Sequence, residues 1–226
     1  MYNIIVAYKA VLFDLDGTLL DTLQDIADST DVALAKLGFP GHDLQTYRGF
    51  MGKGMTALAL KALPESSRNP DAVSQLLVSI GKEYAVRWTV HTHPYPGIFE
   101  LLDAIVAKGI MMAILSNKPH EFTLEQVEKL LPHCNFDEGM GAFGAIPLKP
   151  DPTGALAISR KLRISPLDFI YLGDTEIDMK TAMAAGMHPV GALWGFRTGE
   201  ELLAGGAWAL IQHPTELLSL ITRMNS

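Results

Sequence analysis

The segment Phe169-Ile170-Tyr171-Leu172, followed by Gly173-Asp174-Thr175-Glu176-Ile177-Asp178, contains the pattern that decides the fold. A short apolar run ends in a polar turn, and apolar residues at helical spacing begin directly after it. The same order recurs through the second half of the chain. Buried strands are predicted at Ile110–Leu115, Phe169–Leu172, Pro189–Leu193 and Ala207–Ile211, and amphipathic helices at Phe99–Lys108, Glu121–Leu131, Thr153–Leu162 and Ile177–Ala185.

Alternating strands and helices of this length predict a parallel sheet with right-handed crossovers and helices on both faces. Ala10–Leu15 is a further apolar run of the same kind near the N-terminus. We therefore expect an α/β fold in which this first strand belongs to the same sheet.

The pattern changes between the first strand and Gly97, where we predict only helices. They are expected at Asp21–Leu37, Met55–Leu63 and Asp71–Trp88, the first of them ending before Gly38 and Pro40. A helical block inserted after the first strand of an α/β domain is best interpreted as a separate cap. The sequence thus predicts a discontinuous core of residues 1–19 and 94–226 and a helical cap of residues 20–93.

Composition excludes several classes of protein. The chain has 226 residues, 48% of them hydrophobic and 19% charged, and a formal net charge of −7, which argues against a nucleic-acid groove. The single cysteine, Cys134, permits no intrachain disulfide, and the apolar run Ile4–Val6 is too short for a signal peptide. No segment is long and apolar enough for a membrane span. We expect a cytoplasmic protein, either a monomer or a homodimer.

Polar residues of chemical use follow four of the predicted strands, where ligands bind in parallel sheets. Asp14 and Asp16 end the first strand, and Asp174 and Asp178 follow the strand Phe169–Leu172. Crowded carboxylates need a cation or a shared proton, and oxygen ligands suit Mg²⁺. The alternative is that these aspartates belong to a plain turn or cap helices.

The other two clusters are suited to an anion. Ser116, Asn117 and Lys118 follow the strand Ile110–Leu115, and Lys149 lies between the strands in a loop stiffened by Pro150 and Pro152. A hydroxyl, an amide and backbone N–H groups before a helix can bind a phosphate. Each residue also has an ordinary interpretation, since Ser116 or Asn117 could cap a helix and Lys149 could be a solvated surface charge.

Together, these segments resemble the haloacid-dehalogenase-like hydrolase superfamily over nearly the whole chain. Its phosphatases carry an Asp-x-Asp-Gly-Thr run, a Ser or Thr, a Lys and a Gly-Asp-x-x-x-Asp run, which stand here as Asp14–Thr18, Ser116, Lys149 and Gly173–Asp178. The resemblance implies a Rossmann-like core with an inserted helical cap. Finer features resemble the phosphoglycolate-phosphatase-like branch, namely Asp21–Asp25, Tyr95–Gly97, Ser116–Pro119, Trp194-Gly195 and Glu200–Leu202.

The resemblance also implies a role for each residue. Asp14 would be the nucleophile that forms an aspartyl-phosphate, and Asp16 the general acid and then base. Ser116, the Asn117 backbone and Lys149 would hold the phosphoryl oxygens. Mg²⁺ would be bound by Asp14, the Asp16 backbone carbonyl and Asp174, with Asp178 ordering its waters. In the cap, Gly52-Lys53-Gly54 resembles a substrate loop, and Lys53 and Arg48 would contribute to substrate selection; a tight turn is the alternative for the two glycines.

The substrate implied is a small phosphorylated metabolite, with phosphoglycolate the first guess. Pyrophosphatases, sugar-phosphate phosphatases and phosphomutases of the same fold remain alternatives. A dehalogenase has no use for Asp16 or for the acidic residues Asp174 and Asp178. A non-catalytic phosphometabolite-binding regulatory protein would not need a nucleophile beside an acid.

Overall fold

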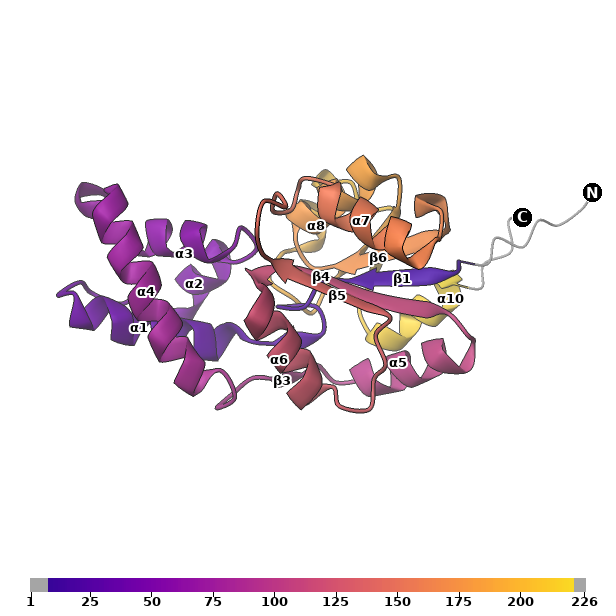
Figure 1. Ribbon diagram of the computed structural model, residues 1–226, viewed down its shortest axis with the longest axis horizontal. Helices are drawn as coiled ribbons and strands as arrows, with labels where there is room; N and C mark the ends of the chain where they lie inside the picture. The colour runs from indigo at the N-terminus through magenta and orange to yellow at the C-terminus, as the bar shows by residue number, and fades with distance from the viewer. Residues whose placement is uncertain (1–7, 222–226) are drawn as a thin grey trace, which may run out of the picture.

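The computed structural model describes residues 8–221, so the apolar run Ile4–Val6 lies outside the described residues. Its centre is a six-stranded, all-parallel sheet with the strand order β5-β4-β1-β6-β7-β8 (Figure 1). The strands are β1 (Ala10–Phe13), β4 (Met111–Pro119), β5 (Glu138–Ala142), β6 (Phe169–Gly173), β7 (His188–Ala192) and β8 (Ala209–Ile211). The predicted α/β class with a parallel sheet is confirmed.

Helices cover both faces of this sheet. Alternate residues of β1 point to opposite sides, so that Val11 and Phe13 pack in one apolar cluster while Ala10 and Leu12 pack in the other. One face is covered by α5 (Ile98–Ala107), α6 (His120–Leu130) and α10 (Leu217–Ile221), and the other by α7 (Thr153–Leu162) and α8 (Glu176–Ala185) (Figure 1). The short helix α9 (Gly199–Ala204) lies between β7 and β8 in the chain.

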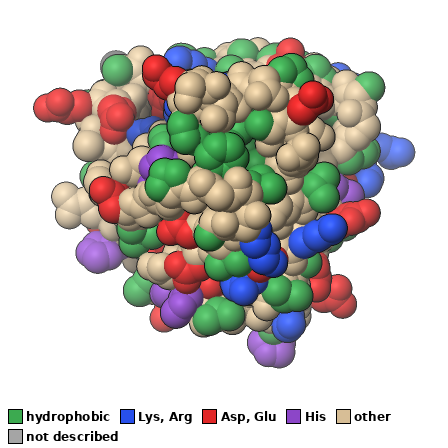
Figure 2. All heavy atoms as spheres, turned by 90° about the vertical axis from the view of Figure 1, so that its left-hand side faces the viewer, with side chains coloured by type: hydrophobic (Ala, Val, Ile, Leu, Met, Phe, Trp, Pro, Cys, Tyr) green, Lys and Arg blue, Asp and Glu red, His purple; other side chains and the backbone are tan. Residues whose placement is uncertain are grey.

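Four helices follow β1 and pack mainly on one another beyond one end of the sheet. They are α1 (Leu23–Lys36), α2 (Leu44–Phe50), α3 (Met55–Ala62) and α4 (Pro70–Arg87), and we call them the helical insert. The insert has two apolar clusters of its own, and it is joined to the sheet through a two-stranded antiparallel ribbon of β2 (Leu20–Asp21) and β3 (His93–Pro94). Figure 2 views the molecule from this end, where hydrophobic, basic and acidic side chains are all exposed.

Sequence and structure differ at short or atypical elements. Strand β5 was not predicted, because Glu138-Gly139-Met140-Gly141-Ala142 lacks β-branched and aromatic residues; it forms as an edge strand paired with β4. Helix α2 was also missed, and so were the two-residue strands β2 and β3. No helix within residues 8–221 has the length and apolar character needed to cross a membrane.

Candidate active site

The four predicted clusters meet at the carboxyl end of the sheet. Parallel pairing places β1 between β4 and β6, so Asp14 emerges next to the ends of both neighbours, and its N–H donates to the Leu172 carbonyl at 2.9 Å. Asp14, Ser116, Lys149 and Asp174 are each less than a tenth exposed. Burial of so many polar groups at one point is costly unless they are paired, so their arrangement indicates a site rather than a core.

Lys149 is the centre of the ion pairs around Asp14. Its Nζ lies 2.7 Å from Asp14 Oδ1 and 2.6 Å from Asp178 Oδ1. Burial disfavours the charge of Lys149, but the two carboxylates outweigh this effect and raise its pKa well above the ordinary value. Lys149 is thus a fixed cation beside the candidate nucleophile, and the structure does not place it at the surface, the alternative interpretation of its sequence context.

Three carboxylates lie close enough to share a cation. Ligand oxygens of Asp14, Asp174 and Asp178 lie within 4.8 Å of one another, and all three residues are buried. Burial, and after it Asp178, raise the pKa of Asp14 while Lys149 lowers it, and the net result is a pKa of about 7. Burial, Asp14 and Asp178 raise the pKa of Asp174 as well. One lysine cannot balance three ionised carboxylates, but a divalent cation together with Lys149 would. An all-oxygen set of this kind fits Mg²⁺.

Asp174 and Asp178 are held by hydrogen bonds from their own surroundings. The Thr18 hydroxyl donates a hydrogen bond to Asp174 at 3.1 Å. The Phe196 N–H donates another to the same carboxylate at 2.7 Å. Asp178 accepts from the N–H and the hydroxyl of Thr175, a capping box at the start of α8. Asp178 therefore caps its helix and also joins the carboxylate cluster. The structure shows the capping interaction, which was the alternative in the sequence, and the role of Asp178 at a metal stays a prediction.

Two glycines, Gly17 and Gly195, allow the backbone to pack closely against Asp174. A Cβ at Gly17, where φ is +87°, would lie 2.3 Å from Asp174 Oδ2. A Cβ at Gly195 would lie equally close to the Asp174 Cβ. The Gly17-Thr18 turn therefore brings its backbone against the carboxylate at a distance that no side chain permits.

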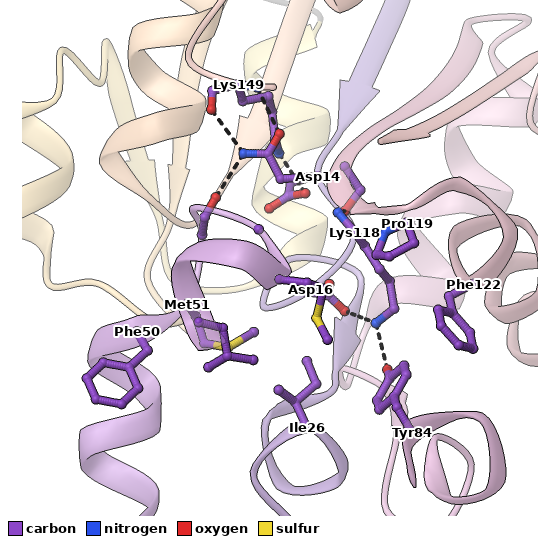
Figure 3. Close-up of a pocket in the computed structure, with 16 residues that line it drawn as sticks. Asp14, Asp16, Ile26, Phe50, Met51, Tyr84, Lys118, Pro119, Phe122 and Lys149 are labelled. Carbon is purple, nitrogen blue, oxygen red and sulfur yellow. Dashed lines mark hydrogen bonds and ion pairs between the residues drawn. The ribbon is translucent and has the colours of Figure 1, made fainter. Parts of the chain in front are cut away.

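Asp16 faces away from the carboxylate cluster. Its Oδ1 accepts a hydrogen bond from Lys118 Nζ at 2.8 Å, and the same ammonium donates to the Tyr84 hydroxyl of α4 at 2.6 Å (Figure 3). Asp16 is thus not among the clustered side-chain ligands; the metal contact expected of it was through its backbone. Burial lowers the pKa of Lys118, but the interactions with Asp16 and Tyr84 have the larger effect, so its pKa is raised above the ordinary value.

Lys118 is the residue whose role the sequence analysis missed. It belongs to the predicted cluster Ser116–Lys118, but the sequence assigned no function to it. In the structure, β4 extends to Pro119 with a register irregularity between Leu115 and Pro119, and Lys118 contacts Asp16 and Tyr84, partners that no local sequence pattern links to it. The helix predicted at Glu121–Leu131 is observed as α6, which begins at His120.

The side chain of Asn117 connects the helical insert to the loop that contains Lys149. Its side-chain amide donates to the Gly52 and Lys149 carbonyls, each at 3.0 Å, and its Oδ1 accepts from the Lys149 N–H at 2.8 Å. The side-chain amide is therefore held by hydrogen bonds within the protein, and anion binding by the Asn117 backbone stays a prediction. The Ser116 hydroxyl accepts from the Lys118 N–H at 3.2 Å and lines the same cavity.

The site opens into a small cavity of about 40 Å³ between the sheet and the insert. About 10–15 Å³ on this measure holds one water, so the space is suited to a small molecule. Its lining comprises Asp14, Asp16, Ser116, Asn117, Lys118 and Lys149 from the sheet side, Pro119 and Phe122 beside them, and Ile26, Phe50, Met51, Gly52, Gly54, Met55, Leu58 and Tyr84 from the insert.

Two of the residues expected to select substrate lie outside this cavity. Arg48 donates to the carbonyls of Gly195 and Phe196, and it lines an outer groove together with Lys53. Gly52 does line the cavity, where its carbonyl accepts from Asn117. The structure therefore brings Gly52 to the other site residues and does not bring Arg48 or the Lys53 side chain there.

Comparison with known proteins gives a consistent result. The family model for haloacid dehalogenase-like hydrolases matches residues 11–192. A phosphoglycolate phosphatase of Nitrosospira multiformis is 31% identical over 220 residues, which cover 95% of this chain and 96% of the relative. A phosphoglycolate phosphatase of Thiobacillus denitrificans is 28% identical over 218 residues, which cover 95% of this chain and 96% of that relative. The crystal structure of a proposed phosphoglycolate phosphatase from Lactobacillus delbrueckii subsp. bulgaricus superposes with a TM-score of 0.90 at 28% identity, covering 96% of this chain and 99% of that one.

Proposed function

This chain belongs to the haloacid dehalogenase-like hydrolase family and is a phosphatase, and we propose that it hydrolyses a small phosphate monoester through an aspartyl-phosphate on Asp14. The observation that carries the proposal is the pairing of buried Asp14 with Lys149, beside a second carboxylate, Asp16, on the cavity wall. A nucleophile, a cation for the phosphoryl oxygens and a proton carrier are the parts that the reaction needs.

In the proposed reaction, an Asp14 oxygen attacks phosphorus as the ester oxygen leaves. Asp16 gives its proton to that leaving oxygen, and later takes a proton from the water that hydrolyses the aspartyl-phosphate. Lys149, the Ser116 hydroxyl and the Asn117 backbone would hold the phosphoryl oxygens, where positioning and charge stabilisation supply most of the rate. The small cavity leaves little room for bulk water beside the intermediate.

We further propose that the carboxylates of Asp14 and Asp174 bind Mg²⁺, with Asp178 beside them. The support is the donor set, three buried carboxylates against one lysine. When bound, the ion would neutralise the negative charge that gathers between Asp14 and the phosphate. It would also remove the electrostatic penalty of bringing a dianionic phosphate to this acidic site.

Residues 20–93 are proposed to act as a cap over this reaction, with residues 1–19 and 94–226 as the hydrolase core. The support is that the insert has apolar clusters of its own and supplies one wall of the cavity. The connections run through β2 and β3, where a hinge can open the site to substrate.

Phosphoglycolate is the leading substrate, supported by the two relatives of that name and by the small cavity. Pyrophosphate and sugar phosphates remain to be compared with it, and so does isomerisation of a sugar phosphate by a mutase. A panel of these compounds, assayed for both phosphate release and isomerised product, ranks them by kcat/KM.

The test of the mechanism is the Asp14→Asn variant. We expect it to lose at least 1,000-fold in kcat and to form no phosphoenzyme, because an amide oxygen is a poor nucleophile. Asp168→Asn is the matched control, since Asp168 makes a surface ion pair with Lys9 at 2.7 Å, at the opposite end of β6. Near-full turnover by Asp14→Asn would refute the assignment of the nucleophile.

A further inference from the structure

We propose that Lys118, with the Tyr84 hydroxyl, binds a carboxylate on the leaving group, so that the enzyme selects small phosphate monoesters that carry a carboxylate. This inference rests on the proposed function and deepens it. Lys118 is then a specificity-determining residue, distinct from the residues that act on phosphorus.

The first observation is the burial of a second lysine in the cavity. Lys118 is 5% exposed, and Lys118 and Lys149 are the two positively charged residues among those that line the cavity. Lys149 pairs with Asp14, where the phosphoryl group would bind. Figure 3 shows Lys118 on the other side of Asp16, pointing between Asp16 and the insert. The cavity thus has one cation for the phosphate and a separate one toward the leaving group.

The second observation is how Lys118 is held. Its ammonium contacts Asp16 at 2.8 Å and the Tyr84 hydroxyl at 2.6 Å, and it lies 4.6 Å from the centre of the Tyr84 ring. Gln126 Nε2 of α6 donates to the same hydroxyl at 2.9 Å. The charge is therefore fixed in place by residues of α4 and α6, as a binding group must be if it is to discriminate between ligands.

The third observation is the apolar character of the remaining wall. Apart from Tyr84 and the glycines Gly52 and Gly54, the lining from the insert and from α6 consists of the apolar residues Ile26, Phe50, Met51, Met55, Leu58 and Phe122. These side chains offer no hydrogen bonds to the hydroxyl groups of a sugar, and a hydroxyl buried against them would lose its partners in water. A compact anion next to Lys118 makes a charge-assisted hydrogen bond instead.

Geometry also explains how Lys118 becomes available. An ammonium has three N–H donors, and within the described residues Asp16 and Tyr84 take two of them. To protonate the leaving oxygen, Asp16 must turn toward that oxygen. A carboxylate two atoms beyond the oxygen then lies on the Lys118 side and takes the position that Asp16 gives up. Substrate recognition and the positioning of Asp16 are thereby linked through one lysine.

The test compares two phosphate esters of nearly equal size, 2-phosphoglycolate and 2-hydroxyethyl phosphate. The first carries a carboxylate where the second carries a hydroxymethyl group. For Lys118→Met, we expect the ratio of the two kcat/KM values to fall by about 100-fold, with KM for phosphoglycolate carrying much of the loss. Tyr84→Phe should lower the ratio by about 10-fold. Lys129→Met is the matched control on α6, where the lysine lies over the Trp88 ring outside the cavity, and its ratio should not change.

Each outcome separates the two proposals. If Lys118→Met lowers kcat/KM for both esters by the same factor, Lys118 serves only to position Asp16 and the inference is overturned. If Lys118→Met does not fold, Tyr84→Phe decides, because it removes a single oxygen. A wild-type enzyme that hydrolyses both esters equally well refutes the inference and leaves the phosphatase mechanism standing. A wild-type enzyme that hydrolyses neither ester also overturns the inference, and the wider panel of phosphate esters then tests the proposed function separately.

Discussion

At the scale of single residues, Asp14 is placed where a carboxylate is costly. It is buried beside Asp178, and Lys149 opposes the repulsion between the two carboxylates. The same burial excludes water from the nucleophile and makes the residue reactive toward a bound phosphate. The residue that the chemistry needs is therefore one that the metal-free fold tolerates poorly.

A pH dependence of stability follows from this placement. The pKa of Asp14 is about 7 in the fold and near its ordinary value of 3.8 in the unfolded chain, so the folded state binds more protons between these values. A raised carboxylate pKa means that the metal-free protein loses stability as pH rises from about 4 to 7. The loss assigned to Asp14 is on the order of 3 kcal/mol.

Urea unfolding in the presence of a chelator, at pH 5 and pH 8, measures this loss. We expect Asp14→Asn to lose less stability than the wild type between the two pH values, and Mg²⁺ to restore the wild type at pH 8. Equal pH dependence in the two proteins would show that Asp14 does not titrate as its burial implies.

At the scale of elements, the turn between α2 and α3 decides how the insert meets the sheet. Gly52 binds Asn117 through its carbonyl, and Gly54 has φ +81° and ψ 172°, a conformation open almost only to glycine. A Cβ at Gly54 would lie 3.2 Å from the Asn117 carbonyl oxygen. Glycines here are thus required both by the backbone and by the close approach to β4, in agreement with the turn that was the alternative for them.

Two alanine variants separate the effect of the backbone conformation from the effect of the close approach to β4. Gly109 also has a positive φ, +68°, but a Cβ there meets nothing within 4 Å. We expect Gly109→Ala to cost about 1 kcal/mol of stability and leave kcat/KM unchanged. Gly54→Ala should cost 1–3 kcal/mol and also lower kcat/KM about 10-fold, because the turn must move away from Asn117. Equal kinetics in the two variants, measured with phosphoglycolate, would contradict a role for this contact.

At the scale of the whole molecule, two arginines cross between the insert and the core. Arg48 of α2 donates to the carbonyls of Gly195 and Phe196, and Arg197 of the core donates to the carbonyls of Arg48 and Met51, at 3.0 and 2.8 Å. Near the β2–β3 connection, Asp25 accepts from the N–H groups of two successive residues, His91 and Thr92. The arginine hydrogen bonds therefore join the insert to the core, while the Asp25 contacts connect α1 to the segment that follows α4.

Removal of one of these arginines should loosen that arrangement. For Arg197→Ala, we expect a larger radius of gyration in X-ray scattering and a 5- to 20-fold rise in KM, since about two charge-assisted hydrogen bonds to the insert are lost. Arg160→Ala is the control, because Arg160 is exposed on α7. An Arg197→Ala enzyme with wild-type dimensions and KM would show that other contacts keep the insert in place.

The sequence by itself determined the order of elements and the chemistry of the strand ends. Apolar runs such as Phe169–Leu172 predict strands because period and burial are local properties, and the acidic and basic residues that follow them stand next to them in the chain. This was enough to predict a parallel sheet, the insertion and the residues Asp14, Asp174 and Lys149 as one group.

Only the tertiary structure decided which side chains meet across the cavity. Lys118 and Tyr84 are 34 residues apart, and Lys118 and Asp16 are 102 apart, so no local pattern links them. Arg48 turned to the carbonyls of Gly195 and Phe196 for the same reason. Long side chains adopt the partner that packing of the insert against the sheet supplies, and that packing depends on contacts distant in the chain.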